Sequence, residues 1–334
     1  MSWPALTFRL KQSIAELLDY ESRCNLRICS KDDRNTVDST RFIPKMLKIY
    51  EFASDMSEGK TIIRLDIDTF TVWFIGKENL TRIDRGWNGQ IIEGFSEIKQ
   101  KNRHDLIGDY LQRFSHKGFI KSDTVELEGI EFPPSSTWKF KCTNAKLLNI
   151  MNNNNVAWLR NFVPFDEKFK TVEIRSWGDS EEVTELILKM RITKTLKVDQ
   201  ELKFDDKDLE GIEAMDCLLS SSNVTAEGAK KRLESFLKNG NKTDKLEMCF
   251  PVPANFDART QIIPKDLVVK KLKKDNEQEG EFYGKIFGGF VNVHGVQEPR
   301  EIDCMQFGDI VRLSCNLYEK SKRPCMLYPF YYLP

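Results

Sequence analysis

Short apolar segments recur along the middle of the chain at a nearly constant spacing. Comparable positions in six of them are residues 125, 148, 172, 196, 218 and 247, which lie 23, 24, 24, 22 and 29 residues apart. The segments are residues 125–127, 147–150, 172–174, 196–198, 217–219 and 246–249. A repeat of about this length accommodates one strand and one helix. Strands that alternate with helices favour parallel pairing with the helices on one side, so the pattern predicts an α/β fold.

Helical features occupy three of the intervening stretches, which are residues 156–162, 180–190 and 225–240. In the last of these, Thr225 is a favourable N-cap and Gly240 a favourable stop. The segment 217–237 also resembles a leucine-rich repeat in its strand, asparagine turn and helix. We therefore predict an irregular leucine-rich-repeat-like α/β solenoid over residues 121–250. The alternative is an irregular α/β domain whose spacing is close to 24 by chance.

The regions on either side have other patterns. Within 43–120, residues 46–52 read as a strand and residues 61–75 as a hairpin, because the alternation changes phase at 68–69. Helical periodicity is predicted over 95–114. These elements form the start of the α/β domain.

The last region, residues 251–334, is predicted to be a strand-rich cap. Its charged segment 270–281 is typical of a solvated loop or hairpin tip. The chain closes on four aromatic residues within 328–332. They are interpreted as docking the terminus onto its own domain, with a contact to a partner as the alternative.

Residues 1–42 are helical in pattern, with Ser22 as a favourable N-cap for a second helix and a third short helix over 31–39. One face of the first helix carries Leu6, Leu10, Ile14 and Leu18, and the second helix carries Leu26 and Ile28, which makes six apolar residues. Helices totalling about 35 residues are too small to hold a core alone. The segment is therefore either a docking module that needs a partner or a helical cap on the domain that follows.

The same segment resembles an F-box. The corresponding positions run without a gap and are Leu6, Leu10, Ile14, Leu18, Asp19, Leu26, Ile28, Ser30 and Lys31. Residues 20–39 are similar in detail to the F-box of the large nematode-expanded F-box families, in which an F-box-associated domain follows. Three positions differ from the usual pattern: Thr7 and Tyr20 replace prolines, and Asp33 replaces a tryptophan.

The resemblance implies the substrate-recognition adaptor of a cullin–RING (SCF-type) ubiquitin ligase. The module would dock on a Skp-type adaptor of the cullin ligase core through its six apolar residues, and the following domain would recruit an unknown protein target. Polar residues beside the strand cores are the expected target contacts, namely Glu173, Arg175, Lys197 and Asp199. The alternative is a non-catalytic interaction domain no longer coupled to a ubiquitin ligase.

Composition weighs against other classes of protein. Lysine plus arginine and aspartate plus glutamate both number 51, which gives no electrostatic case for nucleic acid or an anionic membrane. No apolar run approaches the roughly 18 residues of a membrane span, and the first residues lack the features of a signal peptide. Three histidines and no C-x-x-C pair make a metal site unexpected. We expect a cytoplasmic or nuclear protein without catalytic residues or a cofactor.

Overall fold

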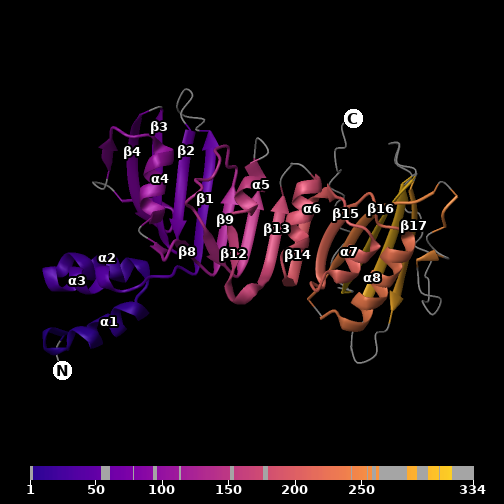
Figure 1. Cartoon of the computed structure of the whole chain (residues 1–334), viewed down its shortest axis with the longest axis horizontal. Helices are drawn as coiled ribbons and strands as arrows, with labels where there is room; N and C mark the ends of the chain where they lie inside the picture. The colour runs from indigo at the N-terminus through magenta and orange to yellow at the C-terminus, as the bar shows by residue number, and fades with distance from the viewer. Residues whose placement is uncertain are drawn as a thin grey trace. The chain divides into compact units, whose positions relative to one another are not determined.

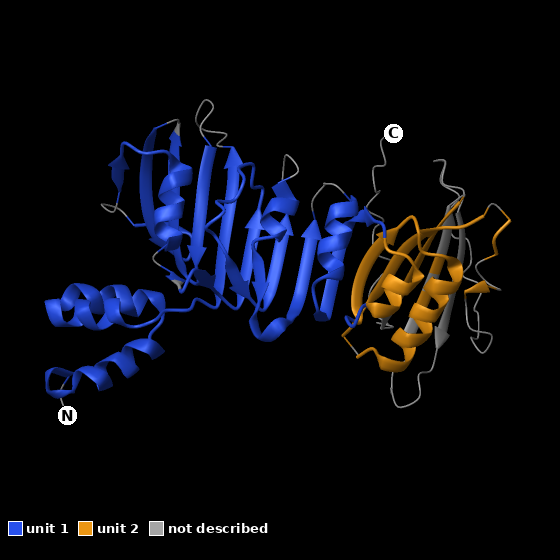
Figure 2. Ribbon diagram, in the orientation of Figure 1, with its two compact units in different colours: residues 1–203, 212–214 blue, residues 204–211, 215–334 orange. Residues whose placement is uncertain are grey.

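The protein is a mixed α/β chain that divides into two compact units (Figure 2). The first comprises residues 1–203 with 212–214, and the second residues 204–211 with 215–334. The computed structural model describes residues 3–53, 61–77, 79–92, 96–112, 114–150, 154–175, 180–241, 243–253, 255–257, 261–262, 284–291, 300–307 and 309–317. The predicted loop at 270–281 and the aromatic segment 328–332 lie outside these residues.

Unit 1 is built on a sheet with the strand order β14-β13-β11-β9-β1-β2-β3-β4-β5, and β6 pairs with β4 (Figure 1). The parallel strands are β1 (Met46–Ala53), β9 (Thr124–Glu128), β11 (Asn144–Leu148), β13 (Phe169–Arg175) and β14 (Ile192–Leu202). The antiparallel strands beyond β1 are β2 (Thr61–Ile67), β3 (Phe70–Lys77), β4 (Leu80–Trp87), β5 (Gln90–Ile91) and β6 (Glu97–Lys99). The predicted hairpin is confirmed as β2 and β3, and the predicted parallel pairing is confirmed from β9 to β14.

One face of this sheet is apolar because alternate residues of each strand point the same way. Five register partners form a buried row across the parallel strands, and none is more than 1% exposed; they are Leu47, Val125, Ala145, Val172 and Leu196. Figure 1 shows α4 (Arg103–Gln112), α5 (Asn154–Leu159) and α6 (Ser180–Leu188) on one face of the sheet. The ring of Tyr110 in α4 meets Phe74 of β3 edge-on at 5.2 Å between centroids. The helices therefore cover the apolar face and leave the opposite face open.

A second, four-stranded sheet in unit 1 was not anticipated from the sequence. Its order is β12-β10-β8-β7, with bounds Phe162–Pro164, Phe140–Cys142, Phe119–Lys121 and Ser115–His116. Strand β8 precedes β9, β10 precedes β11 and β12 precedes β13, so each of these three longer strands follows a short one, and the leucine-rich-repeat-like solenoid itself stays a prediction. Trp158 of α5 is fully buried between Phe132, Trp138 and Phe140, and its indole N–H donates to the Phe132 carbonyl at 3.1 Å.

The strands of unit 2 are ordered β15-β16-β19-β18-β17. Its elements are α7 (Asp206–Gly211), β15 (Asp216–Ser221), α8 (Ala226–Asn239), β16 (Leu246–Pro251), β17 (Gly284–Val291), β18 (Arg300–Phe307) and β19 (Ile310–Leu317). Strands β15 and β16 are parallel and the rest pair antiparallel. The Thr225 side chain caps α8 by accepting from the Gly228 N–H at 3.2 Å, and Gly240 follows the helix. This confirms the predicted helix and both of its end signals.

Three predicted elements are corrected by the structure. Residues 95–114 are not one helix, because β6 occupies 97–99 and α4 begins at Arg103. The helix expected over 156–162 ends at Leu159 and is followed by β12. The N-terminal segment forms α1 (Phe8–Leu17), α2 (Tyr20–Cys29) and α3 (Lys31–Ser39), so the second helix begins two residues before Ser22. In the first two cases a short polar break separates elements that the apolar spacing joined.

Substituting Trp158 tests how much the aromatic core contributes to the stability of unit 1. We expect Trp158→Ala to lower the free energy of unfolding by about 3–5 kcal/mol, because it leaves a cavity under β10. Denaturant unfolding followed by circular dichroism measures this. Leu188→Ala, at a side chain 43% exposed, is the matched control and should cost no more than about 0.5 kcal/mol. Equal losses in the two variants would contradict the packing described.

Candidate functional site

The three N-terminal helices each begin with a side-chain cap. Thr7 accepts from the Leu10 N–H at 3.4 Å, Asp19 from the Ser22 N–H at 2.7 Å, and Ser30 from the Asp33 N–H at 3.0 Å. Ser22 is therefore the residue whose N–H is capped, and Asp19 is the cap. The module that these helices form, residues 3–39, has its turns specified locally.

The three positions that differ from the usual F-box pattern all have structural partners. Thr7 is the N-cap of α1. Asp33 accepts a hydrogen bond from the indole N–H of Trp3 at 2.7 Å and another from the Ser30 hydroxyl at 2.7 Å. These bonds, first from Ser30 and then from Trp3, lower the pKa of Asp33. An indole is therefore present in this corner of the module, supplied by Trp3 rather than by position 33.

Tyr20, the third such position, attaches the module to the sheet. Its ring lies 5.2 Å from Phe42, 5.0 Å from Phe70 and 5.6 Å from Phe114, measured between centroids. Phe70 belongs to β3, and Phe114 follows α4. Aromatic pairs at these distances stabilise beyond the area they bury. The predicted need of the module for a neighbouring domain is met in part by this contact.

Arg23 holds the same junction from inside the module. It is 2% exposed and donates hydrogen bonds to the carbonyl oxygens of Leu18 at 3.3 Å, Thr40 at 3.4 Å and Arg41 at 2.8 Å. Its guanidinium also lies over the Phe42 ring at 5.1 Å. Desolvation lowers the pKa of Arg23, against a raising influence from Glu16. The buried cation thus ties α2 to the segment that leads into β1.

Several apolar residues of the module are exposed in the described chain. Of the six predicted docking residues, Leu10 is 45% and Ile28 76% exposed, and the other four are intermediate: Leu6, Ile14, Leu18 and Leu26. Phe8 and Leu17 of α1 are also exposed, at 53% and 86%. The exposed large apolar side chains of the module are therefore Phe8, Leu10, Leu17 and Ile28. Leu10 and Leu17 are seven residues apart on one face of α1, and they give it an apolar surface that another protein could bury.

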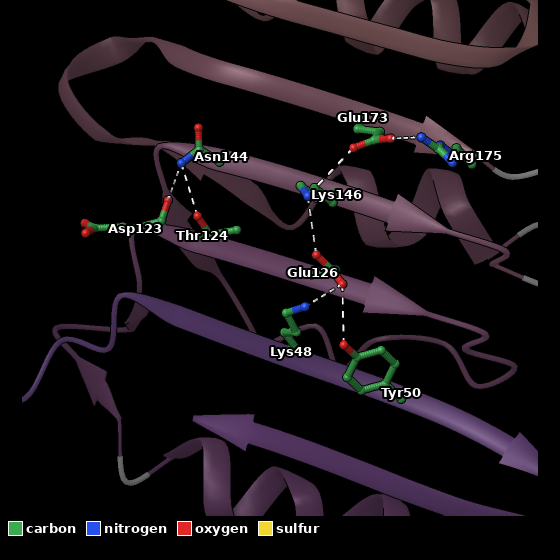
Figure 3. Close-up of polar contacts among 9 residues, drawn as sticks. All are labelled: Lys48, Tyr50, Asp123, Thr124, Glu126, Asn144, Lys146, Glu173 and Arg175. Carbon is green, nitrogen blue, oxygen red and sulfur yellow. Dashed lines mark hydrogen bonds and ion pairs between the residues drawn. The ribbon is translucent and has the colours of Figure 1, made fainter. Parts of the chain in front are cut away.

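The open face of the unit 1 sheet carries a row of alternating charges (Figure 3). Lys48, Glu126, Lys146, Glu173 and Lys197 are register partners on β1, β9, β11, β13 and β14. The Glu126 carboxylate is 3.0 Å from the Lys48 ammonium and 3.5 Å from that of Lys146, which also lies 3.9 Å from Glu173. Opposite charges on neighbouring strands stabilise their pairing.

Within this row the carboxylates lie deeper than the cations. The side chains of Glu126 and Glu173 are 9% and 12% exposed, whereas those of Lys146 and Arg175 are 33% and 56% exposed. Desolvation lowers the pKa of Lys48, but its hydrogen bonds to Glu126 and Tyr50 outweigh that effect and raise the pKa overall. The buried carboxylates therefore hold neighbouring strands together, and the longer basic side chains provide most of the accessible charge.

The four predicted target-contact residues lie together on this face. Arg175 pairs with Glu173 at 2.6 Å and lies 3.8 Å from Asp199, and Lys197 is the register partner of Glu173. Sequence reasoning missed Lys48, Glu126 and Lys146, which continue the same row. The signal was present, because each parallel strand places one charged residue between two apolar ones at the same register.

Comparison with protein-family models, with curated proteins and with solved structures finds no match to this chain. Within the described residues, no cluster of three or more histidine, cysteine, aspartate or glutamate side chains is arranged to bind a metal ion. The helices in the same part of the chain are too short or too polar to cross a membrane. The candidate site therefore consists of two surfaces of unit 1: the apolar module surface and the charged open face.

Acidification should test the capping role of Asp19. The Ser22 N–H and hydroxyl lower the pKa of Asp19. Its contribution to stability is therefore fully present above the unfolded value of about 3.9 and is lost as the pH falls through the folded pKa. Asn is also a good N-cap but does not titrate. We expect the melting-temperature difference between the natural protein and Asp19→Asn to shrink from pH 5 to pH 3, and a constant difference would contradict this role.

The charged row makes a separate prediction about Glu126. Replacing it by Gln leaves Lys48 and Lys146 without their shared carboxylate, so Glu126→Gln should lower the free energy of unfolding by about 1–2 kcal/mol. Glu128→Gln is the matched control, since Glu128 is on the same strand and face and has no ion pair among the described residues. Denaturant unfolding that gave the same value for both variants would show that the row is not stabilising.

Proposed function

We propose that this protein is the substrate-recognition subunit of an SCF-type cullin–RING ubiquitin ligase. The observation that carries the proposal is the apolar surface of a helical module whose turns are capped and whose helices leave Leu10 and Ile28 uncovered. The F-box resemblance of the same residues supports a Skp-type adaptor as the partner. On this proposal the protein works in the cytoplasm, the nucleus or both.

Burial of the module surface would drive the docking. Each side chain of the size of Leu10 or Ile28 contributes about 1.5–3 kcal/mol when it leaves water completely. Leu17, seven residues after Leu10 on the same face of α1, extends the exposed apolar area beyond the six residues identified from the sequence. Association also costs translational and rotational freedom, so several such residues must act together.

The second part of the proposal assigns target recruitment to the open face. A rigid sheet presents Lys146, Glu173, Arg175, Lys197 and Asp199 at spacings that its register determines. The protein would then contribute no bond chemistry of its own. It would act by proximity, because holding a target near the ubiquitin carrier raises the local concentration of the reacting groups.

The alternative is a non-catalytic interaction domain that is no longer coupled to a ubiquitin ligase. The packing of Tyr20 against Phe42, Phe70 and Phe114 favours it, because the module has a structural contact with its own sheet. A helical cap of this kind would need no adaptor. The two functions therefore differ in whether the exposed residues of α1 and α2 bind another protein.

Charged substitutions on the module surface separate the two functions. We expect Leu10→Asp or Ile28→Asp in the full chain to reduce adaptor co-purification by at least tenfold while the melting temperature stays within a few degrees, because both side chains are exposed. Leu188→Asp is the matched control, with an exposed leucine on α6 that should not affect the adaptor. Undiminished co-purification in both module variants would refute the assignment and leave the uncoupled domain as the better description.

A further inference from the structure

Two lysines lie side by side on the small sheet of unit 1. Lys121 of β8 and Lys141 of β10 are register partners in a parallel pair. Like charges on directly neighbouring strand positions are destabilising. The open face of the large sheet avoids this arrangement, since Lys48 and Lys146 are there separated by Glu126. The small sheet therefore retains a pair of like charges that weakens the pairing of β8 with β10.

Two further cations, Arg41 and Lys117, act electrostatically on Lys121. Desolvation and then repulsion from Arg41, Lys141 and Lys117 lower the pKa of the Lys121 ammonium. We call Arg41, Lys117, Lys121 and Lys141 the cation cluster. Arg41 and Lys117 are exposed, and the two strand lysines are partly exposed. Among the described residues, no carboxylate oxygen lies within 4.0 Å of any of the four cationic groups, whereas most cations of the open face are paired.

Apolar side chains accompany the cluster on the same face. The Lys141 ammonium lies 5.8 Å from the centre of the Phe165 ring. Phe119 precedes Lys121 by two residues, and Val163 is the register partner of Lys141, so both point to that side. Both are partly exposed. The surface thus combines four cations that have no carboxylate within 4.0 Å among the described residues with the partly exposed apolar side chains of Phe119, Val163 and Phe165.

We propose that the cation cluster binds an acidic peptide segment of a partner protein. Carboxylates of the peptide would pair with the four cations, which have no ion pair of their own among the described residues, and Phe119, Val163 and Phe165 would contact the aliphatic parts of the segment. A peptide fits better than nucleic acid, because four cations make a small footprint and the chain as a whole has equal numbers of basic and acidic residues. The surface is separate from the six docking residues and from the charged row, so it goes beyond the proposed ligase function.

The test measures binding and stability on the same full-length variants. A fluorescent hexaglutamate peptide should bind the natural protein at low salt, with affinity falling as salt is added. Lys121→Gln/Lys141→Gln should weaken binding by at least tenfold while the melting temperature stays equal or rises, because the repulsion is removed. Lys121→Arg/Lys141→Arg should keep the affinity within about threefold, which separates a charge effect from a folding effect. Lys194→Gln/Lys207→Gln, at two exposed lysines elsewhere, is the control and should bind normally.

Four results would overturn this assignment. They are absence of peptide binding by the natural protein, equal binding by the Lys121→Gln/Lys141→Gln variant, equal binding of a hexaglutamine peptide, and tighter binding of a single-stranded oligonucleotide than of hexaglutamate. The outcome is independent of the ligase proposal, since Leu10→Asp removes the adaptor contact and leaves the cation cluster intact. Failure of adaptor binding would therefore not count against the acidic-peptide site.

Discussion

Helices cover one face of the unit 1 sheet, and the opposite face is in contact with water, so its side chains have to be polar. The sequence meets this constraint by placing one charged residue between two apolar ones in successive parallel strands. The apolar neighbours, such as Val125 and Val172, are fully buried, while Glu126 and Glu173 pair with Lys146 between them. The resulting row stabilises strand pairing and keeps a broad polar surface in a defined geometry. Both the core and the proposed target surface follow from this alternation.

The N-terminal module adds the second surface. Its helices are capped by their own side chains, and Tyr20 and Arg23 join it to the segment and strands that follow. These contacts use the polar and aromatic residues of the module and leave Leu10, Leu17 and Ile28 facing outwards. A module whose helices are capped by its own side chains and which keeps Leu10 and Leu17 exposed is suited to bind a partner without refolding. The cation cluster, on the small sheet of the same unit, is a third surface with a different chemistry.

Much of the fold could be predicted from the sequence, because the apolar segments recur at a regular spacing and α8 has clear end signals at Thr225 and Gly240. The short strands β8, β10 and β12 could not, since three residues show no recognisable period. The cap at Asp19 was missed because Ser22 has the same preference and only the backbone geometry distinguishes them. The sequence shows one charged residue between two apolar ones in each parallel strand of unit 1, but it does not show which of these charges are neighbours. That requires the register between strands, which a spacing of about 24 residues does not fix to the nearest residue. Glu173 and Lys197 were therefore predicted from the sequence, whereas Glu126 on β9 and Lys146 on β11, which belong to the same row, were not.

The central claim is that the exposed helices of the module are a binding surface, and hydrogen–deuterium exchange of the full chain with and without a Skp-type adaptor tests it most directly. The account predicts slower exchange over residues 6–29, which include α1 and α2, and unchanged exchange over β9 to β14. Exchange that is unchanged throughout, or slowed at the sheet and not at the module, would contradict it.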